Sequence, residues 1–195
     1  MPEYPVHTSS LPEAKIMADL VGVHNDLKLV MDILTRWLTV QNDTVLAPAL
    51  FSAAHITYRR CFTSGVRNGL TRDDVANIRN NAVELHDYLI AQASKLIAHS
   101  VNPFEQTRIG ILVIEDTVGG VATLNSRLLS LKESDIIQWG SLVKIIGNTI
   151  LAPRIEQARQ AVDTAARALP IVEIKKGQVL SYTAPGPDQA NRRRD

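Results

Sequence analysis

The chain has 195 residues, of which 45% are apolar and 21% are charged, with 21 Lys and Arg against 20 Asp and Glu. This composition is typical of one soluble globular domain, and its near-zero net charge excludes a global field that would attract nucleic acid or an anionic membrane. Because Cys61 is the only cysteine and no stretch approaches the roughly 20 apolar residues of a membrane span, we expect a cytoplasmic protein without internal disulfides, a thiolate zinc cluster or a membrane anchor.

The first long helix is predicted between residues 11 and 40. Residues 1–9 carry two prolines and little periodicity, which predicts a flexible arm before it. Ser10 and Glu13 have the spacing of a capping box, and Pro12 is compatible with a first helical turn. The apolar positions that predict the helix recur every three or four residues: Ile16, Leu20, Val23, Leu27, Val30, Leu34 and Trp37.

Two further helices are expected in the next sixty residues. The second should run from about 44 to 63, with Asp43 or Thr44 as its cap. The third should be continuous from 71 to 100, because Thr71 followed by acidic residues is a good start and apolar residues then recur at helical spacing.

The period changes after the third helix. A β-branched run begins at Arg108, and a second loosely alternating run follows Gly119-Gly120, where we expect a turn. A last helix is predicted over 134–169, capped by Ser134 and kinked at Pro153.

These elements predict a mainly α protein, folded as an antiparallel four-helix bundle. The bundle would form a single domain over residues 10–170, with a β-hairpin at 108–129 inserted between the third and fourth helices. Residues 171–195 would form an extended or disordered tail.

His99 is the first candidate for chemistry, because it stands where the apolar side of the third helix predicts a leucine. With Lys95 one turn earlier and Glu105 shortly after, it could perform acid and base chemistry near neutral pH. Gln92 shares the same edge, and Asn102 follows the histidine. Alternatively, His99 donates a hydrogen bond to a backbone carbonyl and only fixes the end of the helix.

The second helix carries another polar group, made of His55, Tyr58, Arg59 and Arg60. An arginine one turn from a histidine could bind an anion such as phosphate. The alternative is that both arginines are solvated and the Tyr58 ring packs in the core. Cys61 is interpreted as a packing residue. No glycine-rich phosphate loop, zinc helix or nucleophile elbow is present, so we expect neither a cofactor nor a metal.

The segment from residue 89 to 105, Leu-Ile-Ala-Gln-Ala-Ser-Lys-Leu-Ile-Ala-His-Ser-Val-Asn-Pro-Phe-Glu, resembles the third-helix motif of HEPN-like proteins. It is especially similar to actinobacterial and phage proteins with an Ala-His-Ser-Val-Asn-Pro-Phe-Glu run, whose second helix carries a motif matched here by Tyr58-Arg-Arg-Cys-Phe62. The similarity covers about residues 45–130. It implies a helical bundle that forms a two-fold dimer and, in many members, cuts RNA without a metal ion.

The family motif also has an arginine five to seven positions before the histidine. Here those positions hold Ser94, Ala93 and Gln92. Lys95 is cationic, but a point charge does not reproduce the bidentate guanidinium. An arginine, asparagine and histidine pattern also occurs at Arg79-Asn80 and His86.

Three functions follow from the resemblance and the missing arginine. The first is a degenerate, non-catalytic or weakly active HEPN-like binding or regulatory module, linked to phage or defence biology. The second is an active metal-independent ribonuclease that uses His99 with Arg59, Arg60 or Lys95. The third is a structural protein that assembles through its long helices. The expected partners are a second copy of the chain and RNA or another protein.

Overall fold

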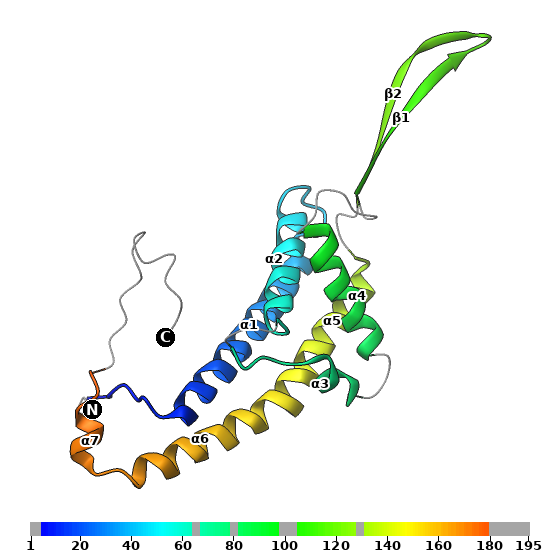
Figure 1. Ribbon diagram of the computed structural model, residues 1–195. Helices are drawn as coiled ribbons and strands as arrows, with labels where there is room; N and C mark the ends of the chain where they lie inside the picture. Colours follow the sequence, from blue (N-terminus) through cyan, green and yellow to red (C-terminus); the bar gives the residue numbers. More distant parts are fainter. Residues whose placement is uncertain (1–4, 64–66, 79–81, 98–104, 128–130, 180–195) are drawn as a thin grey trace. The chain divides into compact units, whose positions relative to one another are not determined.

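The computed structural model describes residues 5–63, 67–78, 82–97, 105–127 and 131–179. The fold is mainly helical and contains one antiparallel two-stranded hairpin (Figure 1). The chain divides into two compact units, one of residues 18–157 and one that joins 1–17 to 158–195. Within the described ranges, none of the helices has the length and apolar character needed to cross a membrane.

Helix α1 spans Pro12–Val40 and confirms the predicted first helix. Its start differs from the prediction, since the Ser10–Glu13 capping box does not form. The Leu11 amide donates to Ser9 Oγ instead, and Glu13 Oε2 is buried without a hydrogen-bond partner. Ile16 is exposed, whereas the later members of the predicted apolar row are buried: Leu20, Val23, Leu27, Val30, Leu34 and Trp37.

Helix α2 spans Leu46–Arg60 and is shorter at its C-terminus than predicted. Of the two expected caps, Asp43 is the one used. Its Oδ1 accepts hydrogen bonds from the amides of Val45 and Leu46 at 2.9 and 2.8 Å, which lowers the pKa of Asp43. The carboxylate therefore satisfies amides that have no partner within the helix.

The predicted single helix over 71–100 is wrong. Its place is taken by α3 (Arg72–Ala76), α4 (Ala82–Gln92) and a π-helical turn, η1 (Ala93–Ile97). The predicted cap is correct, because Thr71 forms a reciprocal capping box with Asp74. The helix ends where the Asn77 side chain donates to the Asp73 carbonyl at 2.9 Å, a local bond that competes with continued helix.

Strands β1 (Glu105–Ile114) and β2 (Thr117–Arg127) confirm the predicted hairpin. The turn, however, is Glu115-Asp116 and not the glycine pair. Glu115 has φ 52°, in the left-handed region. Gly119 is instead the extra residue of a bulge, since Leu112 pairs with Gly120 and Val113 with Val118.

The last long helix is confirmed as α5 (Glu133–Ile145), the π-helical η2 (Ile146–Leu151) and α6 (Ala152–Arg167). Lys132 occupies the N-cap position without a side-chain cap, so the predicted cap at Ser134 is wrong. The π-helical segment ends two residues before Pro153. Proline has no amide hydrogen and crowds the carbonyl four residues earlier, and a wider turn is one way to accommodate both effects.

The segment after Pro170 begins as helix α7 (Ile171–Lys175), whereas the sequence predicted an extended tail. The N-terminal arm is also held in place, because His7 forms an isolated antiparallel bridge with Val179 and the Thr8 amide donates to the Gln178 carbonyl at 2.7 Å. Residues 7–8 and 178–179 therefore lie side by side within one compact unit.

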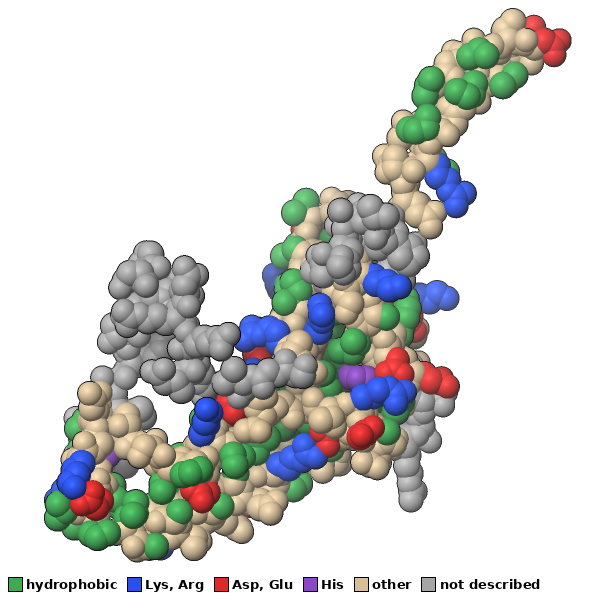
Figure 2. All heavy atoms as spheres, viewed as in Figure 1, with side chains coloured by type: hydrophobic (Ala, Val, Ile, Leu, Met, Phe, Trp, Pro, Cys, Tyr) green, Lys and Arg blue, Asp and Glu red, His purple; other side chains and the backbone are tan. Residues whose placement is uncertain are grey.

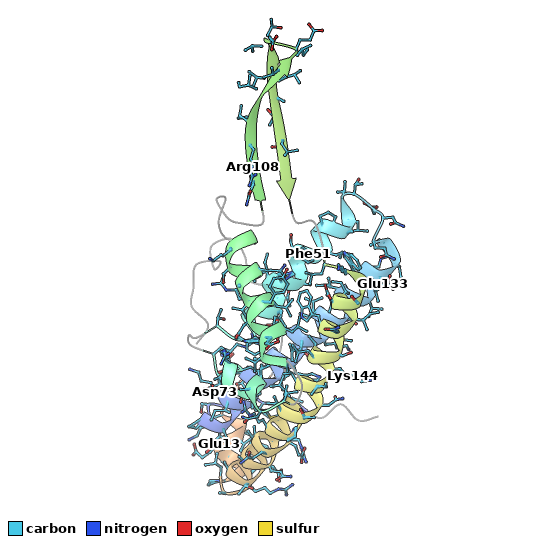
Figure 3. All side chains as sticks on the ribbon, turned by 90° about the vertical axis from the view of Figure 1, so that its right-hand side faces the viewer. Glu13, Phe51, Asp73, Arg108, Glu133 and Lys144 are labelled. Carbon is cyan, nitrogen blue, oxygen red and sulfur yellow. The ribbon has the colours of Figure 1, made fainter. Side chains whose placement is uncertain are left out.

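The core of the 18–157 unit is formed by helices α1, α2, α4 and α5. Trp139 of α5 is fully buried and contacts the rings of His55 and Tyr58 on α2. Figure 3 shows the side chains of these helices filling the space between them. The core positions the polar residues of α2, because its apolar and aromatic groups surround them.

Candidate functional site

His55 is fully buried between α2 and α4. Its Nδ1 donates to the Phe51 carbonyl at 2.9 Å, and its Nε2 lies 2.9 Å from Gln92 Oε1. Burial lowers the pKa of His55, against the opposing effect of the hydrogen bond to the Phe51 carbonyl. The ring is therefore neutral at pH 7.

A neutral ring that donates through Nδ1 has only a lone pair on Nε2. The side chain of Gln92 must then present its amide NH₂ group to His55, with the two nearly isosteric ends of the amide exchanged. This orientation also gives a partner to Gln92 Nε2, which is otherwise buried without one. The pair is thus a neutral hydrogen bond that joins two helices.

A second buried pair joins the same helices. The Tyr58 hydroxyl lies 3.0 Å from His86 Nδ1 and donates to it, because burial raises the pKa of Tyr58 and keeps the phenol protonated. Burial also lowers the pKa of His86, while Asp87 raises it and Arg72 lowers it. His86 is therefore neutral at pH 7 and accepts through Nδ1.

Aromatic rings enclose both pairs. His55 lies 4.5 Å from the ring of Trp139, and His86 lies 4.4 Å from the ring of Phe62. Such surroundings exclude water and favour neutral rings. In the described structure, His55, Tyr58, His86 and Gln92 therefore act as part of the core and are inaccessible to a substrate.

The cations near this cluster have different environments. Arg60 lies 3.6 Å from Asp26 of α1, and Arg67 binds the same carboxylate at 2.8 Å. Arg59 is partly exposed and Lys95 is exposed. Within the described parts of the chain, the side chains of Arg59 and Lys95 form neither a hydrogen bond nor an ion pair. Both cations are therefore available to an anion.

Arg59 and Lys95 lie at different levels of the helix pair. His55 bonds to Gln92 and Tyr58 bonds to His86, so α2 and α4 run antiparallel. Arg59 is one turn beyond His55, whereas Lys95 is one turn beyond Gln92 in the opposite direction. At a rise of about 1.5 Å per residue, their backbones are roughly 10 Å apart along the axis. The structure does not join them in one site.

Of the remaining predicted site residues, only Glu105 lies within the described part of the chain. His99 and Asn102 are outside the described residues, as are Arg79 and Asn80 of the second arginine pattern. Glu105 is the first residue of β1 and pairs with Arg127 of β2. The acid and base site proposed around His99 therefore remains a prediction from the sequence.

Sequence reasoning missed a polar cluster on α1. Asp19 and Asp26 are buried, and both bind the loop after α2: Asp19 accepts from the Asn68 amide at 3.1 Å, and Asp26 binds Arg67. The signal was present, because two acids seven residues apart lie on the same side of the helix as Val23. Cys61 is buried beside them, and burial raises its pKa to about 12, so this thiol is not a nucleophile.

The other unit contains a groove of about 640 Å³ between the N-terminal arm and helices α6 and α7. Its titratable side chains bind neighbouring groups: His7 Nδ1 donates to the Gly177 carbonyl, and Lys176 pairs with Glu173. Among the described residues, no group of three or more His, Cys, Asp or Glu could hold a metal ion. The groove therefore has the volume of a binding site, but its titratable side chains are already bound to neighbouring groups.

No protein-family model, curated protein or solved structure matches this chain.

Proposed function

We propose that the chain is an antiparallel four-helix HEPN-like bundle that forms a two-fold dimer and acts as a non-catalytic or weakly active binding module in phage or defence biology, with RNA as its ligand. The proposal starts from the resemblance of residues 45–130 to that superfamily. It also depends on the absence of the motif arginine, since Gln92, Ala93 and Ser94 occupy the three positions where it would stand.

The buried environment of Gln92 carries the proposal. Gln92 is fully buried and hydrogen bonded to His55, so this position contributes to the core and presents no charge to a phosphate. Without a guanidinium there, the charge that develops on a phosphorane would lack its bidentate donor. A module that has lost this donor is expected to bind without efficient cutting.

The exposed cation on η1 supports RNA as the ligand. Lys95 is exposed, three residues after Gln92, and belongs to the segment that resembles the family motif. A lysine attracts phosphate as a point charge without setting a precise geometry. Such a contact gives affinity that falls as salt rises, because binding releases counterions from the RNA.

The test is a paired binding and cleavage assay on labelled single-stranded RNA in EDTA. We expect wild type to bind without measurable cleavage. Lys95→Ala should weaken binding several-fold and reduce the salt slope by about one unit. Lys144→Ala is the matched control, because Lys144 is an exposed lysine on α5. This variant should change neither the binding affinity nor the salt slope.

Three outcomes would contradict the proposal. RNA cleavage by wild type that disappears in His99→Ala would make the protein an active metal-independent ribonuclease. Absence of binding at low salt would remove RNA as the ligand. A large closed or extended oligomer in light scattering would favour the assembly function instead, since a two-fold pair predicts only twice the chain mass.

A further inference from the structure

The hairpin exposes an apolar face. Successive residues of a strand point to opposite sides, so Ile109, Ile111 and Val113 of β1 share one face. Ile111 pairs with Val121, and Val113 pairs with Val118. The exposed fractions of these five side chains are 66%, 60%, 62%, 74% and 71% for Ile109, Ile111, Val113, Val118 and Val121, respectively. Figure 2 shows apolar side chains along the length of the hairpin.

This face is unusual for a free surface. Single exposed apolar residues are common, but a contiguous β-branched row is typical of an interaction surface. A hairpin of two strands is also only marginally stable in water without another layer. The opposite face is less continuous, because Gly110, Gly120 and Arg108 interrupt it. The Ile111 face is therefore the one that needs a covering layer.

We infer that the Ile111 face, made of Ile109, Ile111, Val113, Val118 and Val121, binds the same face of a second copy of this chain. In the pair, the two hairpins stack antiparallel around a two-fold axis near Ile111. Ile109 of each copy then lies beside Val113 of the other. The same patch serves both copies, as an isologous interface requires.

The area agrees with a dimer. Each exposed aliphatic side chain on the face offers about 100 Å² of apolar surface, so each copy contributes about 500 Å². A stacked pair would bury at most about 1,000 Å², which is the smallest area expected of a biological interface and below that of most stable ones, so the pair is a weak one. The formal net charge of the chain is +1, so the two copies do not repel one another strongly.

Charge at the tip of the hairpin selects the antiparallel arrangement. Glu115 and Asp116 form the tip, whereas Arg108 lies toward the base and on the opposite face, outside the stacked surface (Figure 3). Antiparallel stacking places the two acidic tips at opposite ends of the pair. Parallel stacking would bring four carboxylates together. The acidic tip also opposes insertion into a lipid bilayer, which would have to desolvate both carboxylates.

The first experiment measures the mass of the full-length chain by analytical ultracentrifugation at about 100 μM, where a pair of micromolar affinity is dimeric. We expect wild type to be a dimer and Ile111→Thr/Val121→Thr to be a monomer, because threonine keeps the β-branched shape but is polar. Leu124→Thr is the matched control on the opposite face and should remain dimeric. Monomeric wild type, or a dimeric double variant, would overturn the inference.

The second experiment tests the direction of stacking by thiol cross-linking with a short bifunctional maleimide, because stacked sheets lie about 10 Å apart, too far for a direct disulfide. Ile111→Cys should cross-link two copies rapidly, whereas the native thiol of Cys61 is buried and does not compete. Thr107→Cys alone should not cross-link, because antiparallel stacking separates the two sites by about 26 Å at roughly 3.3 Å per residue. Efficient self-linking of Thr107→Cys would show parallel stacking. Binding of wild type to neutral lipid vesicles in place of dimerisation would refute a protein partner.

Discussion

Acidification from pH 8 to pH 5.5 should destabilise the protein through His55 and His86. Both rings are buried and neutral in the folded chain, and burial lowers the pKa of each. In the unfolded chain each histidine titrates near 6.5. Below that value the unfolded state binds protons that the folded state does not, so the free energy of unfolding falls as pH decreases.

The magnitude follows from this linkage. At one pH unit below 6.5, protonation stabilises the unfolded state by about 1.4 kcal/mol for each histidine that stays neutral when folded. Two such rings give a loss of at most about 3 kcal/mol, a large part of an ordinary stability of 5 to 15 kcal/mol. The carboxylates of Asp74 and Asp87 do not contribute in this window. The pKa values of Asp74 and Asp87 are lowered below 3.8, so their contribution is lost only in stronger acid.

The assay is urea unfolding followed by circular dichroism at pH 7.5, 6.5 and 5.5, with each variant compared with itself across pH. His55→Gln and His86→Asn should each lose about half of the pH dependence, and the double variant should lose nearly all of it. His24→Gln, on an exposed surface of α1, is the control and should behave as wild type. An unchanged pH dependence in the double variant, or stability that rises on acidification, would refute the assignment of neutral buried rings.

Three further predictions concern contacts outside the polar core. Arg154→Ala should destabilise the protein by about 1 to 3 kcal/mol in urea unfolding, because it leaves the largely buried carboxylate of Asp74 without its guanidinium, and a cost near zero would exclude this role. Gly177→Ala should increase proteolysis of the N-terminal arm, because its Cβ would lie 2.2 Å from the Thr8 carbonyl oxygen, and unchanged protection would show that the arm adapts. Cys61 should react with a thiol reagent at pH 8 only as fast as the chain unfolds, because the thiol is buried and burial raises its pKa to about 12, and fast labelling of the native chain would contradict this.

Long periodic segments were predictable from the sequence for a physical reason. In α1, each member of the row from Leu20 to Trp37 reinforces the same helical side, so no single residue decides the outcome. The predicted third helix was wrong at a point where local polar contacts replace the apolar pattern. The side-chain amide of Asn77 binds the Asp73 carbonyl beside the backbone amide of the same residue, and such a contact is invisible in the spacing of apolar residues.

The hairpin shows a similar limit. Its two runs were predicted, but the glycine pair is a stronger turn signal than Glu115-Asp116. Pairing of the strands settles the choice, because a turn at Glu115-Asp116 lets Ile114 pair with Thr117 and extends the ladder to Arg127. This turn requires Glu115 to adopt a left-handed backbone conformation. Gly119 then becomes the extra residue of a β-bulge.

The polar residues of α2 could be found from the sequence, but their partners could not. His55 and Gln92 are 37 residues apart, and Tyr58 and His86 are 28 residues apart. Whether such a side chain faces a ligand or another helix depends on which element packs beside it. The sequence left both interpretations of Tyr58 open, and the structure places its ring in the core.

The two buried pairs also fix the register between α2 and α4. Sliding α4 by one turn would separate His55 from Gln92 and Tyr58 from His86, and each unsatisfied buried group would cost about 1 to 3 kcal/mol. This register depends on a neutral residue at position 92. An arginine there would place a permanent charge against a neutral ring in an aromatic core, at a cost of several kcal/mol. The packing around Gln92 and a catalytic guanidinium at this position are therefore mutually exclusive, and an active site with its arginine at position 92 would require α2 and α4 to pack differently.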